Sequence, residues 1–226
     1  MIKEMLISLF YIILTLFLFI MSNKIYIKYK HTLLNPVIIT TISVILLLIL
    51  FDIPYSTYNK GGRIITYIMG PIVVVLAIPL YKNRNELLKN FIPIVGGIVA
   101  GIIAAFVSVI ILCKVLNLDS AIMLSLLSKS ITTPMAVEST KLLGGNEAIT
   151  IIAVVITGQI GAIISPFIYK YGKIKSNIAK GIGLGSSAHA FGTTKAMEMG
   201  EDIGAASSLA IGVTGLLTII FVIIFA

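Results

Sequence analysis

The chain has 226 residues, of which 58% are hydrophobic and 12% charged, whereas a typical soluble domain is about 25% charged. Its mean hydropathy is +1.09, and a single soluble core cannot bury that much apolar surface. This composition excludes a water-soluble enzyme, a nucleic-acid-binding module and a disordered scaffold. We therefore expect an integral membrane protein.

Six apolar runs contain no charged residue. They span residues 5–22, 32–51, 64–81, 90–113, 148–169 and 203–226. A helix of about 20 residues crosses a hydrocarbon core about 30 Å thick, and these runs lack the alternation of barrel strands. The sequence predicts an all-α polytopic membrane protein with about six full transmembrane helices. The first run is too long for a typical signal-peptide core and has no Ala-x-Ala pattern, so we expect a retained anchor.

The net charge of +8 is concentrated in short loops beside the apolar runs. Loops 22–31, 82–90 and 170–180 together hold more than half of the Lys and Arg residues. Positively charged loops stay in the cytoplasm, so these loops are expected there and the N-terminus outside. The lone Cys113 allows no internal disulfide.

Two further segments, residues 119–147 and 180–202, are apolar overall but interrupted by Gly, Pro, Ser and Thr. Each contains a Thr-Thr pair, then a Gly and an acidic residue, and each is followed by a long apolar run. With one crossing between them, two re-entrant segments would have opposite orientations, as in the inverted repeats of secondary transporters. In the alternative interpretation, each segment is a broken helix that crosses fully, which would place loop 170–180 outside.

The expected organisation is one integral membrane domain over residues 1–226. Residues 1–118 supply scaffold helices, and residues 119–169 and 176–226 form the inverted-repeat units.

Interrupted backbone at membrane depth is tolerated only where protein or a watery cavity covers it. Half-helix N-termini, one ammonium group and small hydroxyls suit a compact carboxylate better than a sugar or a lipid, and the chain has no Trp for sugar stacking. The candidate substrate-binding residues are Lys129, Ser130, Thr132, Thr133, Ser187, His189, Thr193 and Thr194. The helix-breaking or structural residues are Pro134, Gly144, Gly145, Gly185 and Gly192.

Several of these residues also have an ordinary structural interpretation. Lys129 could extend its charge to the membrane interface. His189 is either a proton carrier or one side of an interhelical hydrogen bond. Glu138 is a proton acceptor or an interface carboxylate, and Lys195 and Glu198 are expected to be i,i+3 neighbours on a helix surface.

The sequence does not predict an enzyme. The Gly181-x-Gly-x-Gly stretch lacks the preceding strand that a dinucleotide-binding motif requires. No spacing of His, Cys and Glu resembles a metal site. We expect no catalytic residues, no bound metal and no cofactor.

The interrupted segments resemble the LrgB/CidB family of antiholin-like bacterial membrane proteins. The resemblance rests on Lys129-Ser-Ile-Thr-Thr-Pro134 with Gly144-Gly145, and on Gly185-Ser-Ser-Ala-His189-Ala-Phe-Gly192-Thr193. The stretch from Gly70-Pro71 to Tyr81 is also similar, and the likeness covers roughly residues 33 to 226.

The resemblance implies two functions. Bacterial members are linked to control of murein hydrolase activity and autolysis, beside a small holin-like partner of the LrgA/CidA type. Other relatives are tied to pyruvate uptake and, in plastids, to glycolate and glycerate translocation. We place transport of small monocarboxylates first, in the bacterial cytoplasmic membrane, by a homo-oligomer that binds no nucleic acid. The alternative is an antiholin-like regulator.

Overall fold

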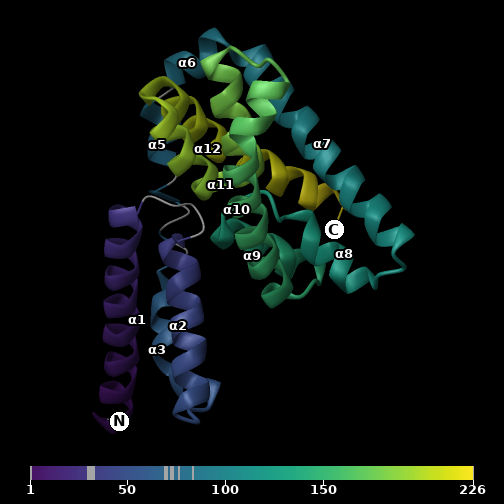
Figure 1. The fold of residues 1–226 in the computed structure, drawn as a ribbon. Helices are drawn as coiled ribbons and strands as arrows, with labels where there is room; N and C mark the ends of the chain where they lie inside the picture. The colour runs from purple at the N-terminus through teal and green to yellow at the C-terminus, as the bar shows by residue number, and fades with distance from the viewer. Residues whose placement is uncertain are drawn as a thin grey trace. The chain divides into compact units, whose positions relative to one another are not determined.

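The computed structural model describes residues 2–29, 34–68, 71, 74–75, 77–82 and 84–225, and every regular element among them is a helix (Figure 1). The all-α polytopic class predicted from the sequence is confirmed. Contacts divide the chain into two compact units, residues 1–72 and 73–226. The division falls inside the segment 1–118 that the sequence analysis assigns to scaffold helices.

The first unit packs α3 closely against α1. Its helices are α1 (Ile2–Tyr29), α2 (Pro36–Leu50) and α3 (Tyr55–Tyr67). Gly61 of α3 lies against the backbone of α1 at Ser8, where a larger side chain would collide. The hydroxyls of Thr15 and Tyr58 join the same two helices at 3.1 Å. Small residues and interhelical hydrogen bonds are the usual means of helix association in lipid.

The second unit is built around α7 and α12. Its helices are α5 (Ala77–Lys82), α6 (Arg84–Lys89), α7 (Phe91–Val115), α8 (Ser120–Leu127), α9 (Thr133–Leu143), α10 (Glu147–Tyr171), α11 (Asn177–Met199) and α12 (Glu201–Phe225). Buried residues of α7 recur every three or four positions, so one stripe of that helix faces the bundle. The stripe comprises Ile94, Ile98, Ile102, Phe106, Val109 and Cys113. It belongs to one hydrophobic cluster with Leu209, Ala210 and Val213 of α12.

Four helices among the described residues are long and apolar enough to cross a membrane. They are Glu4–Tyr29, Phe91–Val115, Glu147–Tyr171 and Glu201–Ile224. These helices correspond to the first, fourth, fifth and sixth predicted runs. The second run forms α2, which has only 15 residues and is therefore about 22 Å long.

The third predicted run, residues 64–81, is not one continuous helix. In the described residues, α3 ends at Tyr67 and α5 begins at Ala77, and part of the intervening segment lies outside the description. Helix α3 also begins well before the apolar run, because its polar half packs on α1. There Lys60 Nζ lies 3.0 Å from Glu4 Oε1. Hydropathy marks only the apolar part of such a helix.

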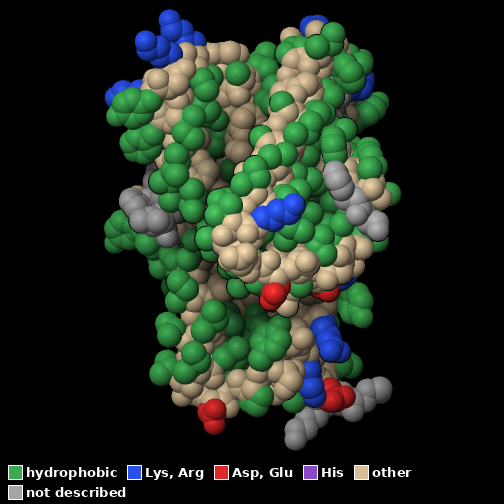
Figure 2. Space-filling model, turned by 90° about the vertical axis from the view of Figure 1, so that its right-hand side faces the viewer, with side chains coloured by type: hydrophobic (Ala, Val, Ile, Leu, Met, Phe, Trp, Pro, Cys, Tyr) green, Lys and Arg blue, Asp and Glu red, His purple; other side chains and the backbone are tan. Residues whose placement is uncertain are grey.

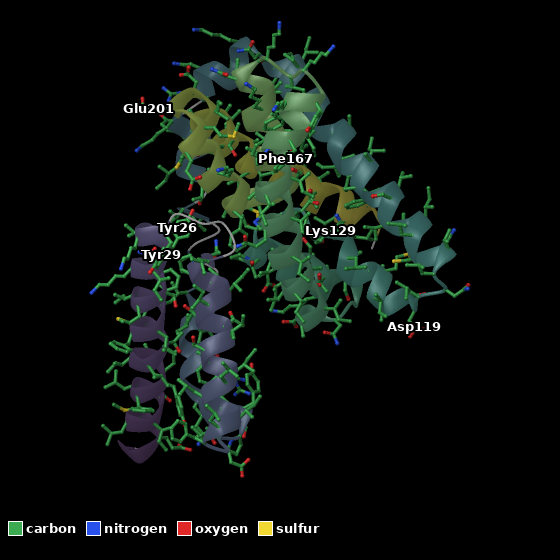
Figure 3. All side chains as sticks on the ribbon, viewed as in Figure 1. Tyr26, Tyr29, Asp119, Lys129, Phe167 and Glu201 are labelled. Carbon is green, nitrogen blue, oxygen red and sulfur yellow. The ribbon has the colours of Figure 1, made fainter. Side chains whose placement is uncertain are left out.

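The basic loops 82–90 and 170–180 lie at the same end of the second unit. Lys82 and Glu201 line one groove at this end, and Lys175 and Asp202 line another. Figure 2 shows several blue Lys and Arg side chains at the top of the view, with others in the middle of the face and near the bottom. Asp119 and Glu201 mark opposite ends of this unit in Figure 3. This arrangement agrees with the predicted placement of both loops on one side of the membrane. Loop 22–31 belongs to the first unit, and its residues 30 and 31 lie outside the description.

Candidate functional site

The first interrupted segment folds as a helical hairpin, formed by α8, a non-helical break at residues 128–132, and α9. After the break the chain returns past α8: the backbone N–H of Asn146 donates to Ser125 Oγ at 2.7 Å. Thr150 Oγ1 donates to the Ser125 carbonyl at 2.9 Å. The end of the segment therefore lies beside α8.

The second interrupted segment is also a hairpin, although its two arms carry the single label α11. The backbone of His189 has φ 39° and ψ −128°, which no helix accommodates, and it separates arms 177–188 and 190–199. Gly192 lies directly against the Leu184 carbonyl. Residues eight apart in a straight helix are about 12 Å apart, so the two arms fold back on each other.

The arms of the second hairpin are too short to cross a bilayer. At about 1.5 Å per residue, neither arm exceeds about 18 Å, against a hydrocarbon core of about 30 Å. Met197 of the second arm packs against Gly204 of α12, so α12 starts beside the returning arm. This geometry agrees with the re-entrant interpretation and not with the fully crossing one. Since α10 alone separates the two hairpins, they enter from opposite ends of the unit.

A buried hydroxyl pair ties the returning arm of each hairpin to the long helix that follows it. Thr140 Oγ1 and Thr150 Oγ1 are 2.8 Å apart between α9 and α10. Thr193 Oγ1 and Ser207 Oγ are 2.7 Å apart between α11 and α12. The repeated Thr-Thr pairs are less equivalent: Thr133 is the first residue of its arm, whereas Thr193 lies a full turn beyond the break at His189.

The two hairpins meet at a cavity of about 70 Å³ between α7 and α12. Ser130 and Ile131 line it from the first break, and Ser186 and Ser187 line it from the first arm of α11. The remaining lining residues are Gly101, Ile102, Ala105, Phe106, Leu127, Thr214 and Thr218. The cavity is large enough for several water molecules or one small organic acid. Its polar groups are hydroxyls, and no charged side chain lines it.

Lys129 lies in the first break, next to Ser130. Its side chain is partly buried, and no ion pair joins it to an acidic group in the described part of the chain. Figure 3 places Lys129 between Asp119 and Glu201, the two ends of the unit. The N-terminus of α9 begins at the same break, and its N-cap, Thr132, makes no side-chain capping bond. The positive end of the α9 dipole and one ammonium group therefore lie near the break.

His189 is buried at the tip of the second hairpin. Its Nε2 lies 3.0 Å from the carbonyl oxygen of Val154, and because a carbonyl only accepts, Nε2 carries the proton in this contact. The ring also packs edge-on against Phe191. The interhelical hydrogen bond expected for His189 is therefore present, and its role as a proton carrier stays a prediction. A non-glycine residue at positive φ is held there only by well-defined surroundings.

The remaining candidate hydroxyls differ in accessibility. Thr132 and Thr193 are buried, and Thr133 is partly buried. Ser187 is exposed and donates to the Gly183 carbonyl at 2.6 Å. Thr194 is exposed and donates to the Ala190 carbonyl at 3.2 Å. The structure thus brings Ser130 and Ser187 to one cavity and turns Thr193 toward α12.

The predicted helix-breaking residues divide into two groups. Pro134 lies in the first turn of α9, and Gly144 ends that helix with φ 73°, a left-handed conformation that favours glycine. Gly145 follows it against Ser125. Gly185 and Gly192 lie within helical arms, where Gly185 meets α12 at Ser207 and Gly192 meets the opposite arm. The break between them falls at His189.

Two acidic residues have ordinary surface contacts. Lys195 Nζ lies 2.9 Å from Glu198 Oε2, which confirms the predicted i,i+3 pair. Glu138 is exposed and pairs with Lys141 at 2.8 Å, as an ordinary surface carboxylate would.

Sequence reasoning missed a set of buried polar groups that have no hydrogen-bond partner among the described residues. They are the hydroxyls of Ser128, Thr132, Ser139 and Thr214 and both amide atoms of Gln159. Only Thr132 among them was a candidate. A lone Gln in the middle of the apolar run 148–169 is a signal that could have been used. Buried polar groups in proteins are normally bonded, so each of these groups is a candidate contact for a ligand or bound water.

The fold and site define a polytopic α-helical membrane protein with two oppositely oriented helical hairpins whose tips meet at a polar cavity. The model of the LrgB-like family matches residues 15–226, and the chain belongs to that family.

The relatives support the same assignment. The chain is 34% identical to the holin-like protein CidB of Staphylococcus aureus over 215 residues, 95% of this chain and 94% of the relative. It is 35% identical to CidB of Staphylococcus epidermidis over 211 residues, 93% and 92% of the two chains. It is 38% identical to the protein YxaC of Bacillus subtilis over 195 residues, 86% and 85% of the two chains. No solved structure matches the chain.

Proposed function

We propose that this protein transports small monocarboxylates, such as pyruvate or glycolate, across the bacterial cytoplasmic membrane. The observation that carries the proposal is the hydroxyl-lined cavity between the hairpin tips, formed by Ser130, Ser186 and Ser187 with Thr214 and Thr218 of α12. Oppositely oriented broken elements that meet between the two ends of a membrane unit are the usual substrate site of secondary transporters. A transporter of this kind catalyses no covalent reaction.

The hydroxyls of the cavity alone would not offset the free energy that a carboxylate loses when it leaves water. Bringing an ion into the membrane interior without a partner costs several kcal/mol. Lys129 directly precedes Ser130 in the first break, and α9 begins three residues after Ser130, so the proposal assigns the opposite charge to the Lys129 ammonium and the N-terminus of that helix. In this proposal the acid is held by hydroxyls in the cavity, and its charge is balanced by Lys129.

The competing proposal is an antiholin-like regulator that acts through a small holin-like membrane partner. It is favoured by the names of the Staphylococcus relatives, which are called holin-like proteins. Such a regulator would work through its lipid-facing helix surfaces and would not need the cavity.

The test is uptake of labelled pyruvate and glycolate into proteoliposomes that contain only this protein. Ser130→Ala and Ser187→Ala should reduce uptake, because both residues line the cavity. The matched control replaces Ile111 and Leu112 by Ala, which are 54% and 57% exposed on α7 and should leave uptake intact. If no labelled carboxylate enters, and the α7 variant alters autolysis in cells, the regulator is the correct function.

A further inference from the structure

Gln159 is the only glutamine in the chain and occupies the central position of α10, which spans Glu147–Tyr171. Twelve residues on either side place it about 18 Å from each end of the helix. Gln159 is 6% exposed, and neither its Nε2 nor its Oε1 has a hydrogen-bond partner among the described residues. A carboxamide without partners at membrane depth is costly, because water is absent there. Polar residues in such positions are usually functional.

The turn of α10 that carries Gln159 packs against the tip of the second hairpin. Gly158 lies against the rings of His189 and Phe191, and Gly161 lies against Ala188. The break that defines the second hairpin and the unpartnered amide are therefore at the same level of α10. The first hairpin reaches the same helix nearby, since Ile131 and Met135 cluster with Val154.

Gln159 does not line the hydroxyl cavity itself. We infer that it binds the transported acid at the adjoining hairpin tip and distinguishes 2-hydroxy from 2-oxo monocarboxylates, an inference that rests on the proposed transport function. The carboxamide presents donors on Nε2 and an acceptor, Oε1. A 2-hydroxy acid matches both, because its carboxylate accepts and its hydroxyl donates. A 2-oxo acid only accepts, so Oε1 would stay buried without a partner. Sites that bond a substrate hydroxyl discriminate strongly against analogues that lack it.

Lactate and pyruvate are the probes, since they have the same carbon skeleton and charge and differ only at C2. In proteoliposomes with the full chain, lactate should half-saturate uptake at a concentration about 10- to 100-fold lower than pyruvate, the usual effect of one unpaired buried polar group. Gln159→Leu, which keeps the size but removes both polar atoms, should bring the two acids to within about threefold. The control is Ser165→Ala on the same helix. Ser165 is buried, and its hydroxyl already donates to the Ala162 carbonyl at 3.3 Å, so the wild-type ratio should persist.

Equal half-saturation by lactate and pyruvate in the wild type would overturn the inference and leave carboxylate transport standing, as would an unchanged ratio in Gln159→Leu. If the wild type takes up neither acid nor any other labelled carboxylate, the proposed function itself is wrong. Thermal unfolding of each variant shows whether it is folded. If Gln159→Leu does not fold, Gln159→Asn is tested instead. Asn keeps the amide group but shortens the side chain by one methylene, so this variant should also lose the discrimination between the two acids.

Discussion

Replacing Lys129 by Met tests the electrostatic part of the proposed mechanism. Met keeps an unbranched apolar stem and removes the charge. The Lys129 side chain is partly buried and has no ion pair within the described residues, so its charge is available for a substrate carboxylate. Losing one partner of a buried charged contact costs about 2–5 kcal/mol, which corresponds to about 30- to several-thousand-fold in affinity. Half-saturation of carboxylate uptake in proteoliposomes should rise by that factor.

Lys141 provides the matched control. Its side chain is 47% exposed and pairs with Glu138 on the surface of α9, a type of contact usually worth about 0–1 kcal/mol. Lys141→Met should therefore change half-saturation less than about fivefold. Lys129→Arg should retain part of the activity, because the charge survives while its point-like geometry changes. If Lys129→Met transports like the wild type at all substrate concentrations, Lys129 does not bind the substrate and only extends its ammonium to the membrane interface. That result would favour the antiholin-like proposal.

Three further predictions follow from the hairpins. His189→Gln keeps a donor for the Val154 carbonyl, so uptake at neutral pH should survive, whereas the pH dependence of uptake should be lost if His189 carries the proton, as measured in vesicles of set external pH; an unchanged profile would assign the proton step elsewhere. Thr193→Val should lower the free energy of unfolding in detergent by about 1–2 kcal/mol, because Ser207 Oγ loses its partner. Thr140→Val should lower it less, since Thr150 still donates to the Ser125 carbonyl. Equal losses in the two variants would contradict this reasoning. In a chain with Cys113 replaced by Ala, a cysteine at Ser176 should be protected from an impermeant maleimide added outside whole cells, and labelling there would reverse the assigned orientation.

The sequence by itself determined the class of protein and the positions of its unusual segments. Charge-free runs of membrane-spanning length and lysine-rich loops are local properties, and the bilayer imposes them residue by residue. Gly, Pro and hydroxyl residues likewise marked both interrupted segments, because they disrupt helices or bond locally wherever they occur. The break at residues 128–132 and the end of α9 at Gly144 were accessible in this way.

Only the tertiary structure decided where the second break falls and which residues share the cavity. His189 has no intrinsic tendency to break a helix; its backbone conformation is fixed by packing against α10 and by its bond to Val154. Ser130 and Ser187 are 57 residues apart in the chain but line the same cavity, a proximity that no local pattern encodes. The polar first half of α3 likewise packs on α1, a distant part of the chain, through Gly61 against Ser8. The sequence shows Gln159 as a single polar residue in an apolar run. Whether its amide has a hydrogen-bond partner depends on the side chains that the tertiary structure packs around it.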